Sequence, residues 1–293
     1  MNQQPIGIFD SGLGGLTVVR EVRRRLPGED IVYFGDTARV PYGSKSPQTV
    51  FRFAFEVSHF LLRFEPKLII AACNTASALA LDELERRLPV PILGVVKPGA
   101  GEAVRRSGGR LIGVIATEAT VNSHAYSREI YAQAPRTPIV EQACPSLVPV
   151  IEEGRTDRDP IVRMLLIDYL EKIRALNPAV LVLGCTHYPL IKRGVAEVIG
   201  DHVALVDSAE ATAAAAEQVL SRQTALSDRT AGGRLRCYVS DNPQRFREVG
   251  SRFLGEPIKD VAWVTPEQFI EPDILDAPPS RDLPVSQSAH IPV

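Results

Sequence analysis

The sequence predicts an α/β protein made of two similar halves, each with a parallel β-sheet covered by helices on both faces. Short apolar runs alternate with longer stretches of helical period, as is typical of strand–helix–strand units. The length of 293 residues exceeds the usual size of one domain. Two strand-like stretches in the first part of the chain are each echoed by a similar stretch further on. Together these observations favour two α/β domains.

The predicted strands are short runs rich in Val, Ile and Leu. They cover residues 6–9, 31–34, 68–72, 92–96, 111–115, 180–183, 203–206, 235–239 and 261–264. The clearest amphipathic helices cover residues 47–65 and 160–175, where apolar residues recur every three or four positions. This order places a helix between most pairs of strands.

The internal echo indicates a duplication. Residues 6–11 (IGIFDS) resemble residues 112–117 (IGVIAT), and residues 69–75 (IIAACNT) resemble residues 181–187 (LVLGCTH) at nearly the same offset. Chance similarity is the alternative, because buried parallel strands all share the same apolar composition. After residue 206 the strand–helix pattern returns and is expected to complete the sheet of the first half. Residues 271–293 are rich in Pro, Ser and Asp, so we predict a mobile tail there.

Composition excludes several classes of protein. The net charge of −2 gives no general attraction to nucleic acid or to an anionic membrane. The N-terminal residues lack the pattern of a signal peptide, and no apolar run approaches the ~20 residues of a membrane span. The four cysteines lie far apart and are expected to be free thiols in a reducing compartment. We therefore expect a cytoplasmic protein with no nucleic-acid or membrane partner.

Polar residues follow several of the predicted strands. In open parallel sheets, reacting groups gather just beyond the carboxyl ends of strands. Small hydroxyl, amide and thiol side chains dominate at these positions, with one histidine, and they suit a small ligand carrying a carboxylate and an ammonium rather than a polyphosphate. The residues are Asp10, Ser11, Asp36, Thr37, Cys73, Asn74, Thr75, Thr117, Cys185, Thr186 and His187.

Cys73 and Cys185 are the most informative of these residues. Each ends an apolar strand at a predicted helix start, where backbone N–H groups and the helix dipole favour a thiolate. A lone buried cysteine more often behaves as a small hydrophobe, but the same arrangement in matching places of both halves favours a chemical role. Cys144 and Cys237 lack this context, and we expect them to be structural.

No metal or organic cofactor is expected. Cys185 and His187 lie close together, but no two cysteines have the spacing of a zinc site. The turn from Gly12 to Gly15 matches neither nucleotide-binding fingerprint and is expected to deliver Asp10 and Ser11 to a cleft. Lys97 ends a strand-like run but is equally well explained as a linker residue, so no lysine stands out as a Schiff-base site.

Four segments with specific motifs run along the chain in order. They are residues 9–16 (FDSGLGGL), 33–43 (YFGDTARVPYG), 72–77 (ACNTAS) and 183–190 (LGCTHYPL). As a set they resemble the aspartate/glutamate racemase family, and within it the glutamate racemases, over residues 6–210. The resemblance implies two doubly wound α/β domains facing each other across a cleft. Residues 1–97 and 207–270 would form the first domain, and residues 98–206 the second.

The resemblance also implies an activity, the cofactor-independent interconversion of L-glutamate and D-glutamate, which supplies D-glutamate for bacterial cell-wall peptidoglycan. Cys73 and Cys185 would be the two acid/base residues. Asp10 and His187 would assist them and contact the substrate, with Glu152 a weaker candidate. The residues expected to hold the substrate are Ser11, Tyr42, Gly43, Asn74, Thr75 and Thr186.

A two-base mechanism accounts for the pair of cysteines. Without an electron-sink cofactor, one group must remove the α-proton and a second must deliver a proton to the opposite face. Three alternatives stay open. They are a Cys185–His187 nucleophile, which leaves Cys73 without a purpose, a racemase acting on aspartate or another acidic amino acid, and a non-catalytic amino-acid-binding protein with two lobes. The sequence does not fix the oligomeric state, and a homodimer is among the possibilities.

Overall fold

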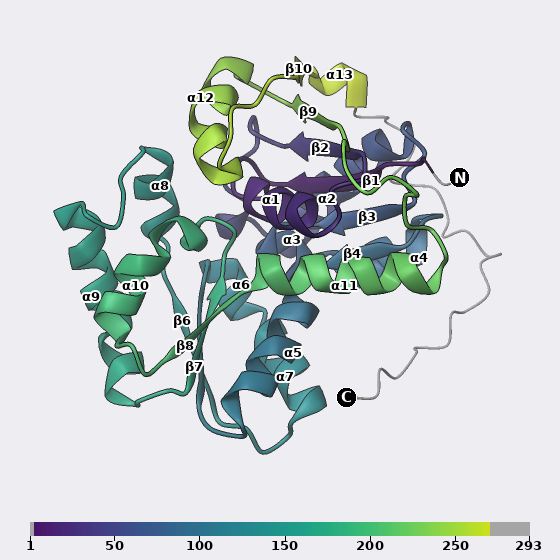
Figure 1. Ribbon diagram of the computed structural model, residues 1–293. Helices are drawn as coiled ribbons and strands as arrows, with labels where there is room; N and C mark the ends of the chain where they lie inside the picture. The colour runs from purple at the N-terminus through teal and green to yellow at the C-terminus, as the bar shows by residue number, and fades with distance from the viewer. Residues whose placement is uncertain (1–2, 270–293) are drawn as a thin grey trace.

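The computed structural model describes residues 3–269, which form two β-sheets surrounded by helices (Figure 1). All neighbouring strands run parallel, and each strand is separated from the next along the chain by at least one helix. Within residues 3–269, no helix is long and apolar enough to cross a membrane.

The larger sheet has six strands, in the order β10 (Val261–Trp263), β9 (Leu235–Val239), β2 (Ile31–Gly35), β1 (Ile6–Asp10), β3 (Leu68–Ala71) and β4 (Ile92–Gly94). The strands β2 and β3 lie on opposite sides of β1, so the direction of winding reverses there. In doubly wound sheets a ligand site forms beyond the carboxyl ends of the strands at such a reversal.

Successive strand residues enter cores on opposite faces of this sheet. Ile6 and Ile8 of β1 enter one core, while Phe9 enters the other. The first core includes residues of α1 (Leu16–Arg25), α11 (Ser208–Arg222) and α12 (Pro243–Leu254), and the second includes residues of α2 (Pro47–Leu62), α3 (Asn74–Leu79), α4 (Leu81–Arg87) and α13 (Pro266–Phe269). Both faces are therefore buried, as the apolar strand sequences predict.

The smaller sheet repeats the strand order around β1. Its strands are β6 (Ile139–Ala143), β5 (Ile112–Ala116), β7 (Val180–Gly184) and β8 (Ala204–Asp207). One face packs against α5 (Val96–Ser107) and α7 (Ala125–Gln133), and the other against α8 (Leu147–Glu152), α9 (Pro160–Ala175) and α10 (Lys192–Ile199). In this order β5 takes the place of β1 and β7 takes the place of β3, as the sequence echo predicts.

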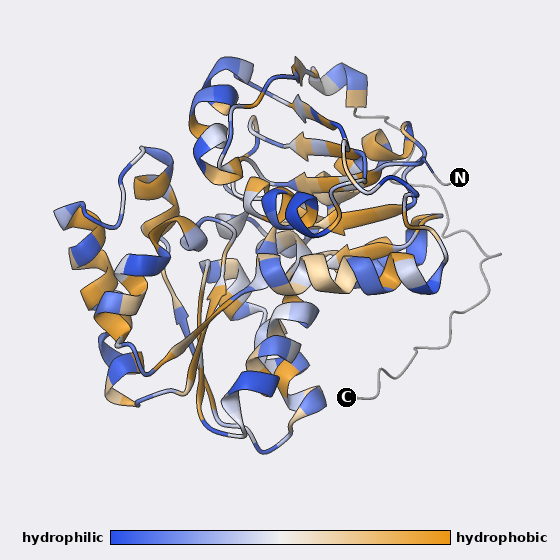
Figure 2. Cartoon of the chain, viewed as in Figure 1, coloured by the Kyte–Doolittle hydropathy of each residue, from blue (hydrophilic) through white to orange (hydrophobic). Residues whose placement is uncertain are grey.

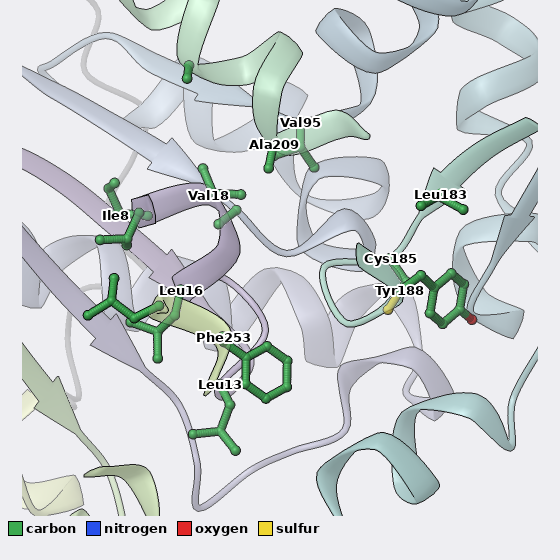
Figure 3. Packing of buried hydrophobic residues seen from close by; sticks show 14 of the residues in the cluster. Ile8, Leu13, Leu16, Val18, Val95, Leu183, Cys185, Tyr188, Ala209 and Phe253 are labelled. Atoms are coloured by element: carbon green, nitrogen blue, oxygen red, sulfur yellow. The ribbon is translucent and has the colours of Figure 1, made fainter. Parts of the chain in front are cut away.

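One hydrophobic core joins the two halves. It extends from Ile8 and Leu16 beside the larger sheet to Leu183 and Tyr188 beside the smaller one (Figure 3). The helix α11 follows the last strand of the smaller sheet and packs along α1 and α5, below the larger sheet in Figure 1. Figure 2 shows most strands of the two sheets largely in the hydrophobic colour, as expected for sheets covered on both faces.

The predicted fold class is confirmed, with two differences in detail. Residues 92–96 were predicted as one strand, but β4 ends at Gly94 and Val96 begins α5. The strand β6 was not predicted, because its sequence IVEQA is only half buried and carries two polar residues. The proposed domain limits stay a prediction, and the predicted tail at 271–293 lies outside the described residues.

Candidate active site

A cleft of about 350 Å³, its mouth included, lies where the carboxyl ends of the two sheets face each other. Its walls come from the segments that follow β1, β2, β3, β5 and β7, together with one residue of α8. The lining residues are Ser11, Val40, Pro41, Tyr42, Gly43, Cys73, Asn74, Thr75, Thr117, Val148, Cys185, Thr186 and His187. Nine of the ten predicted site residues line this cleft, and the tenth, Asp10, lies behind it.

The two cysteines occupy corresponding places in the two halves. Cys73 follows β3 and is the N-cap residue of α3. Cys185 follows β7, but the helix predicted to start there is absent. The chain instead forms the short 3-10 helix η2 (Tyr188–Ile191), and α10 begins only at Lys192. The argument from a helix N-terminus therefore applies to Cys73 and is wrong for Cys185.

Burial controls the protonation of Cys73. Its Sγ atom lies 3.6 Å from Ser11 Oγ, to which the thiol donates a hydrogen bond. Burial, and then the nearby charge of Asp10, raise the pKa of the Cys73 thiol to about 12, although the Ala76 N–H group and Ser11 act in the opposite direction. The helix start was expected to favour a thiolate here. Desolvation outweighs that effect, so Cys73 holds its proton at neutral pH.

A row of three side chains leads to the second cysteine. Cys185 Sγ lies 3.8 Å from His187 Nδ1, and His187 Nε2 lies 2.9 Å from Glu152 Oε1. Burial disfavours the charged imidazolium, but the hydrogen bonds and charges of Cys185 and Glu152 outweigh it and raise the pKa of His187 to about 10. At neutral pH His187 is protonated, with one N–H group directed at each partner. Glu152, the weaker sequence candidate, thus contacts a predicted site residue.

The helix α12 holds this row in place from the side of the larger sheet. The ring of Phe253 meets the His187 ring edge-on, with centroids 5.2 Å apart and an angle of 83°. Arg245 donates a hydrogen bond to the Glu152 carbonyl at 3.3 Å, and Arg252 donates one to the Gly154 carbonyl at 2.9 Å. No sequence motif pointed to these contacts.

Asp10 lies behind the cleft and joins the two halves. Its carboxylate accepts hydrogen bonds from the Gly12 N–H group at 2.9 Å and from the Thr186 hydroxyl at 3.4 Å. Burial raises the pKa of Asp10, against the lowering effect of His187. Gly14 permits this close approach, since a Cβ atom there would lie 2.2 Å from Thr186 Oγ1 and 2.6 Å from His187 Nδ1.

The segment that follows β2 forms one wall of the cleft, and hydrogen bonds on the side away from the cleft hold it in place. The Tyr42 hydroxyl is buried and donates to the carboxylate of Asp36, which also accepts from Ser240. The tyrosine hydroxyl is therefore already engaged, and Tyr42 contributes to the shape of the cleft. Gly43 lies against Thr117, because a Cβ atom at Gly43 would be 2.8 Å from the Thr117 Cβ atom.

Hydrogen-bonding groups face the cleft next to Cys73. Asn74 Oδ1 accepts from the Tyr126 hydroxyl at 2.7 Å, whereas Asn74 Nδ2 is buried and has no partner among the described residues. The hydroxyls of Thr75, Thr117 and Thr120 lie within 3.0–3.3 Å of one another. Thr117 was not among the predicted substrate residues, although the sequence echo places it at the position of Ser11 in the second half.

Chemically, the cleft places two thiols among hydroxyl and amide groups. The Cys73 thiol keeps its proton, and the Cys185 sulfur lies 3.8 Å from Nδ1 of the His187 imidazolium. The described residues contain no group of three His, Cys, Asp or Glu side chains placed to hold a metal ion. The arrangement suits proton transfer to and from a small polar ligand held between two sulfur atoms.

Comparison with known proteins agrees with this geometry. The sequence profile of the aspartate, glutamate and hydantoin racemases matches residues 14–216. The chain belongs to this racemase family. Among curated relatives, the glutamate racemase of Geobacter metallireducens is 48% identical over 269 residues, covering 91% of this chain and 98% of its own.

Solved structures of the family have the same fold. A crystal structure of glutamate racemase from Francisella tularensis in complex with D-glutamate superposes with a TM-score of 0.84 at 38% identity, covering 90% of this chain and 98% of its own. The glutamate racemase of Thermus thermophilus, solved with β-chloro-D-alanine, gives a TM-score of 0.82 at 43% identity, covering 91% and 99%. The racemase fold is thus shared over nearly the whole of each of these chains.

Proposed function

We propose that this chain is a glutamate racemase that moves the α-proton of glutamate between Cys73 and Cys185 without a cofactor. The observation that carries the proposal is the pair of thiols at corresponding strand ends of the two halves, both lining one cleft. A Cys185–His187 nucleophile would account for Cys185 but would leave Cys73, on the other side of the cleft, without a role. An amino-acid-binding protein would need neither thiol.

The relatives support glutamate as the substrate. Curated relatives at 44–49% identity carry the name glutamate racemase, and the Francisella protein was crystallised with D-glutamate. These matches favour glutamate over aspartate, the alternative that the sequence left open.

The protonation of the two thiols sets the direction of each half-reaction. In one form of the enzyme, Cys185 is a thiolate beside the His187 imidazolium and Cys73 is a thiol. Cys185 removes the α-proton, the electron pair passes to Cα and the carboxylate, and the Cys73 S–H bond breaks as its proton reaches Cα from the opposite face. The product enzyme has a Cys185 thiol and a Cys73 thiolate, which is the form that acts on the other enantiomer.

Polar groups of the cleft supply binding and charge stabilisation. We assign substrate contacts to Ser11, Asn74, Thr75 and Thr186, and to the wall at Tyr42 and Gly43, as the sequence predicted. The unpartnered Nδ2 group of Asn74 is suited to a carboxylate oxygen, because an unsatisfied buried donor costs about 1–3 kcal/mol until it is paired. Donors fixed around the carboxylate stabilise the negative charge that develops when Cα loses its proton. Asp10 would assist the reaction from behind the cleft, through the hydrogen bond that its carboxylate accepts from the Thr186 hydroxyl.

The test is incubation with L-glutamate in deuterium oxide. We expect the optical signal to fall to zero while deuterium enters Cα, with no added cofactor. The matched control is Cys237→Ala, which removes a buried thiol that does not line the cleft and is expected to keep the activity. Loss of optical activity without deuterium at Cα, or no change at all, would refute the proposal.

We also propose that the protein is located in the cytoplasm. The four cysteines are free thiols, in keeping with a reducing cytoplasm. There D-glutamate would be made for peptidoglycan, and the partner is the small-molecule substrate. Pairing of two copies into a homodimer is also proposed.

A further inference from the structure

Tyr126 connects the second half of the molecule to a side chain of the cleft that belongs to the first half. It lies in the first turn of α7 and is fully buried. Its hydroxyl donates a hydrogen bond of 2.7 Å to Oδ1 of Asn74, the first residue of α3. Asn74 lines the cleft, whereas Tyr126 does not. Tyr126 therefore contacts the site from outside the cleft.

The Tyr126 ring is confined between α5 and the end of β7. The helices α5 and α7 pack against each other (Figure 1). A Cβ atom at Gly184, the last residue of β7, would lie 3.0 Å from Tyr126 Cε2. A Cβ atom at Gly99, on α5, would lie 3.4 Å from the Tyr126 hydroxyl oxygen, and the Ser208 side chain makes a hydrogen bond to the same hydroxyl. Close packing of this kind leaves the Tyr126 hydroxyl little freedom to move away from Asn74.

The direction of the hydrogen bond decides which group Asn74 presents to the cleft. An amide side chain has an oxygen that accepts and an NH2 group that donates, and the two exchange places when the amide makes a half-turn. Burial raises the pKa of the Tyr126 hydroxyl, although the hydrogen bond of Ser208 acts in the opposite direction. The hydroxyl thus keeps its proton at neutral pH and donates it to Oδ1. This leaves Asn74 Nδ2 as a buried donor with no partner among residues 3–269.

We propose that Tyr126 is a positioning residue for racemisation, which holds the Asn74 amide so that Nδ2, and not Oδ1, meets a carboxylate oxygen of the substrate. This inference rests on the proposed function, in which Asn74 contacts that carboxylate. With the opposite orientation, Oδ1 would repel the carboxylate. A donor that is fixed in advance needs no rearrangement when negative charge develops on the substrate. Loss of the Tyr126 hydroxyl should therefore weaken the contact made by Asn74 without removing any group that touches the substrate.

The test is a double-mutant cycle between Tyr126→Phe and Asn74→Ala, with kcat and KM measured for each variant in both directions. Tyr126→Phe keeps the ring and removes only the hydroxyl. We expect it to lower kcat/KM about three- to tenfold, as the loss of one neutral hydrogen bond does. The double variant should have a kcat/KM within about twofold of Asn74→Ala, because the tyrosine has no amide left to hold. The loss should divide between kcat and KM in the same proportion in Tyr126→Phe as in Asn74→Ala.

Tyr169→Phe is the matched control. It also removes a tyrosine hydroxyl, one that donates to Ser146 Oγ at 3.0 Å, and Tyr169 does not line the cleft. Its kcat/KM should stay within about twofold of wild type. Thermal unfolding followed by circular dichroism checks the fold, and the midpoint for Tyr126→Phe should lie within about 5 °C of wild type.

Failure of this inference and failure of the proposed function give different results. A wild type that does not racemise glutamate refutes the proposed function, and this inference with it. An active wild type with equal kcat/KM in Tyr126→Phe and Tyr169→Phe overturns the positioning role alone. The same fall caused by Tyr126→Phe with and without Asn74 also overturns it, because the tyrosine then acts by another route. A lower unfolding midpoint with kcat and KM unchanged shows a purely structural role.

Discussion

Replacing Glu152 with glutamine tests the row that leads to Cys185. The substitution Glu152→Gln keeps the shape of the side chain but removes the negative charge 2.9 Å from His187 Nε2. His187 is almost fully buried and the Glu152 side chain is 19% exposed, so solvent screens this interaction only in part. The pKa of His187, raised to about 10 in the wild type, should therefore fall.

The size of the fall follows from the strength of the lost interaction. A hydrogen bond to a charged group contributes about 1.5–3 kcal/mol, and one pKa unit corresponds to about 1.4 kcal/mol. The pKa of His187 should thus drop by about one to two units. The imidazolium is the active form, so activity is lost as pH rises through this pKa, and the variant should lose activity at a lower pH than the wild type. At pH 7 both proteins keep the proton, and kcat/KM should differ by no more than about threefold.

The assay is the pH profile of kcat/KM from pH 6 to 10.5, followed by circular dichroism in both directions. Titration of the substrate ammonium is common to all variants and cancels in the comparison. Glu153→Gln is the matched control, because it removes the neighbouring carboxylate, which pairs with Arg155 and not with His187. An unmoved alkaline limb in Glu152→Gln would refute the role given to the row, as would an equal shift in the control.

Three further expectations follow from the geometry. Gly14→Ala should lower kcat/KM at least about hundredfold with the circular dichroism spectrum intact, because its Cβ atom would lie 2.2 Å from Thr186 Oγ1 and a small displacement of a reacting group is costly. The control is Gly101→Ala, whose Cβ atom would face a flexible side chain. Equal activities of the two variants would contradict the contact between Gly14 and Thr186. Phe253→Ala should lower the free energy of unfolding, measured by urea titration, by about 3–5 kcal/mol. It should also shift the alkaline limb of the pH profile of kcat/KM. Destabilisation without that shift would show that the Phe253 ring does not position His187. Full activity is expected in a metal chelator and without pyridoxal phosphate, so loss on chelation, or a gain on adding pyridoxal phosphate, would overturn the cofactor-free proposal.

The positions of the cleft residues could be predicted because parallel sheets restrict where polar groups can gather. A strand buried on both faces leaves only its end for chemistry, so Cys73, Asn74 and Thr75 after one strand, and Cys185 after its counterpart, stood out from the apolar runs. The same echo contained the signal for Thr117.

The protonation of the site could not be predicted from sequence. The pKa of Cys73 depends on how much burial outweighs the N–H groups of α3, and this balance is set by packing from both halves. The contact of His187 with Glu152 and with Phe253 joins three elements that are distant in the chain, and no local pattern encodes it. The prediction of a helix start after Cys185 is wrong for a different, local reason: a turn and the 3-10 helix η2, which contains Pro189, precede α10, and α10 begins only at Lys192.

The most direct test of the two-base account uses Cys73→Ser and Cys185→Ser with α-deuterated D- and L-glutamate. The equilibrium constant between enantiomers is one, so kcat/KM must fall equally in both directions for each variant, and we expect a fall of at least about hundredfold, since a serine hydroxyl is a far weaker acid than a thiol. The asymmetry should appear in the isotope effect on kcat/KM, which should grow in the direction where the introduced serine abstracts the proton. The account predicts opposite directional patterns for the two variants. The same pattern in both, or near-normal turnover in either, would contradict it.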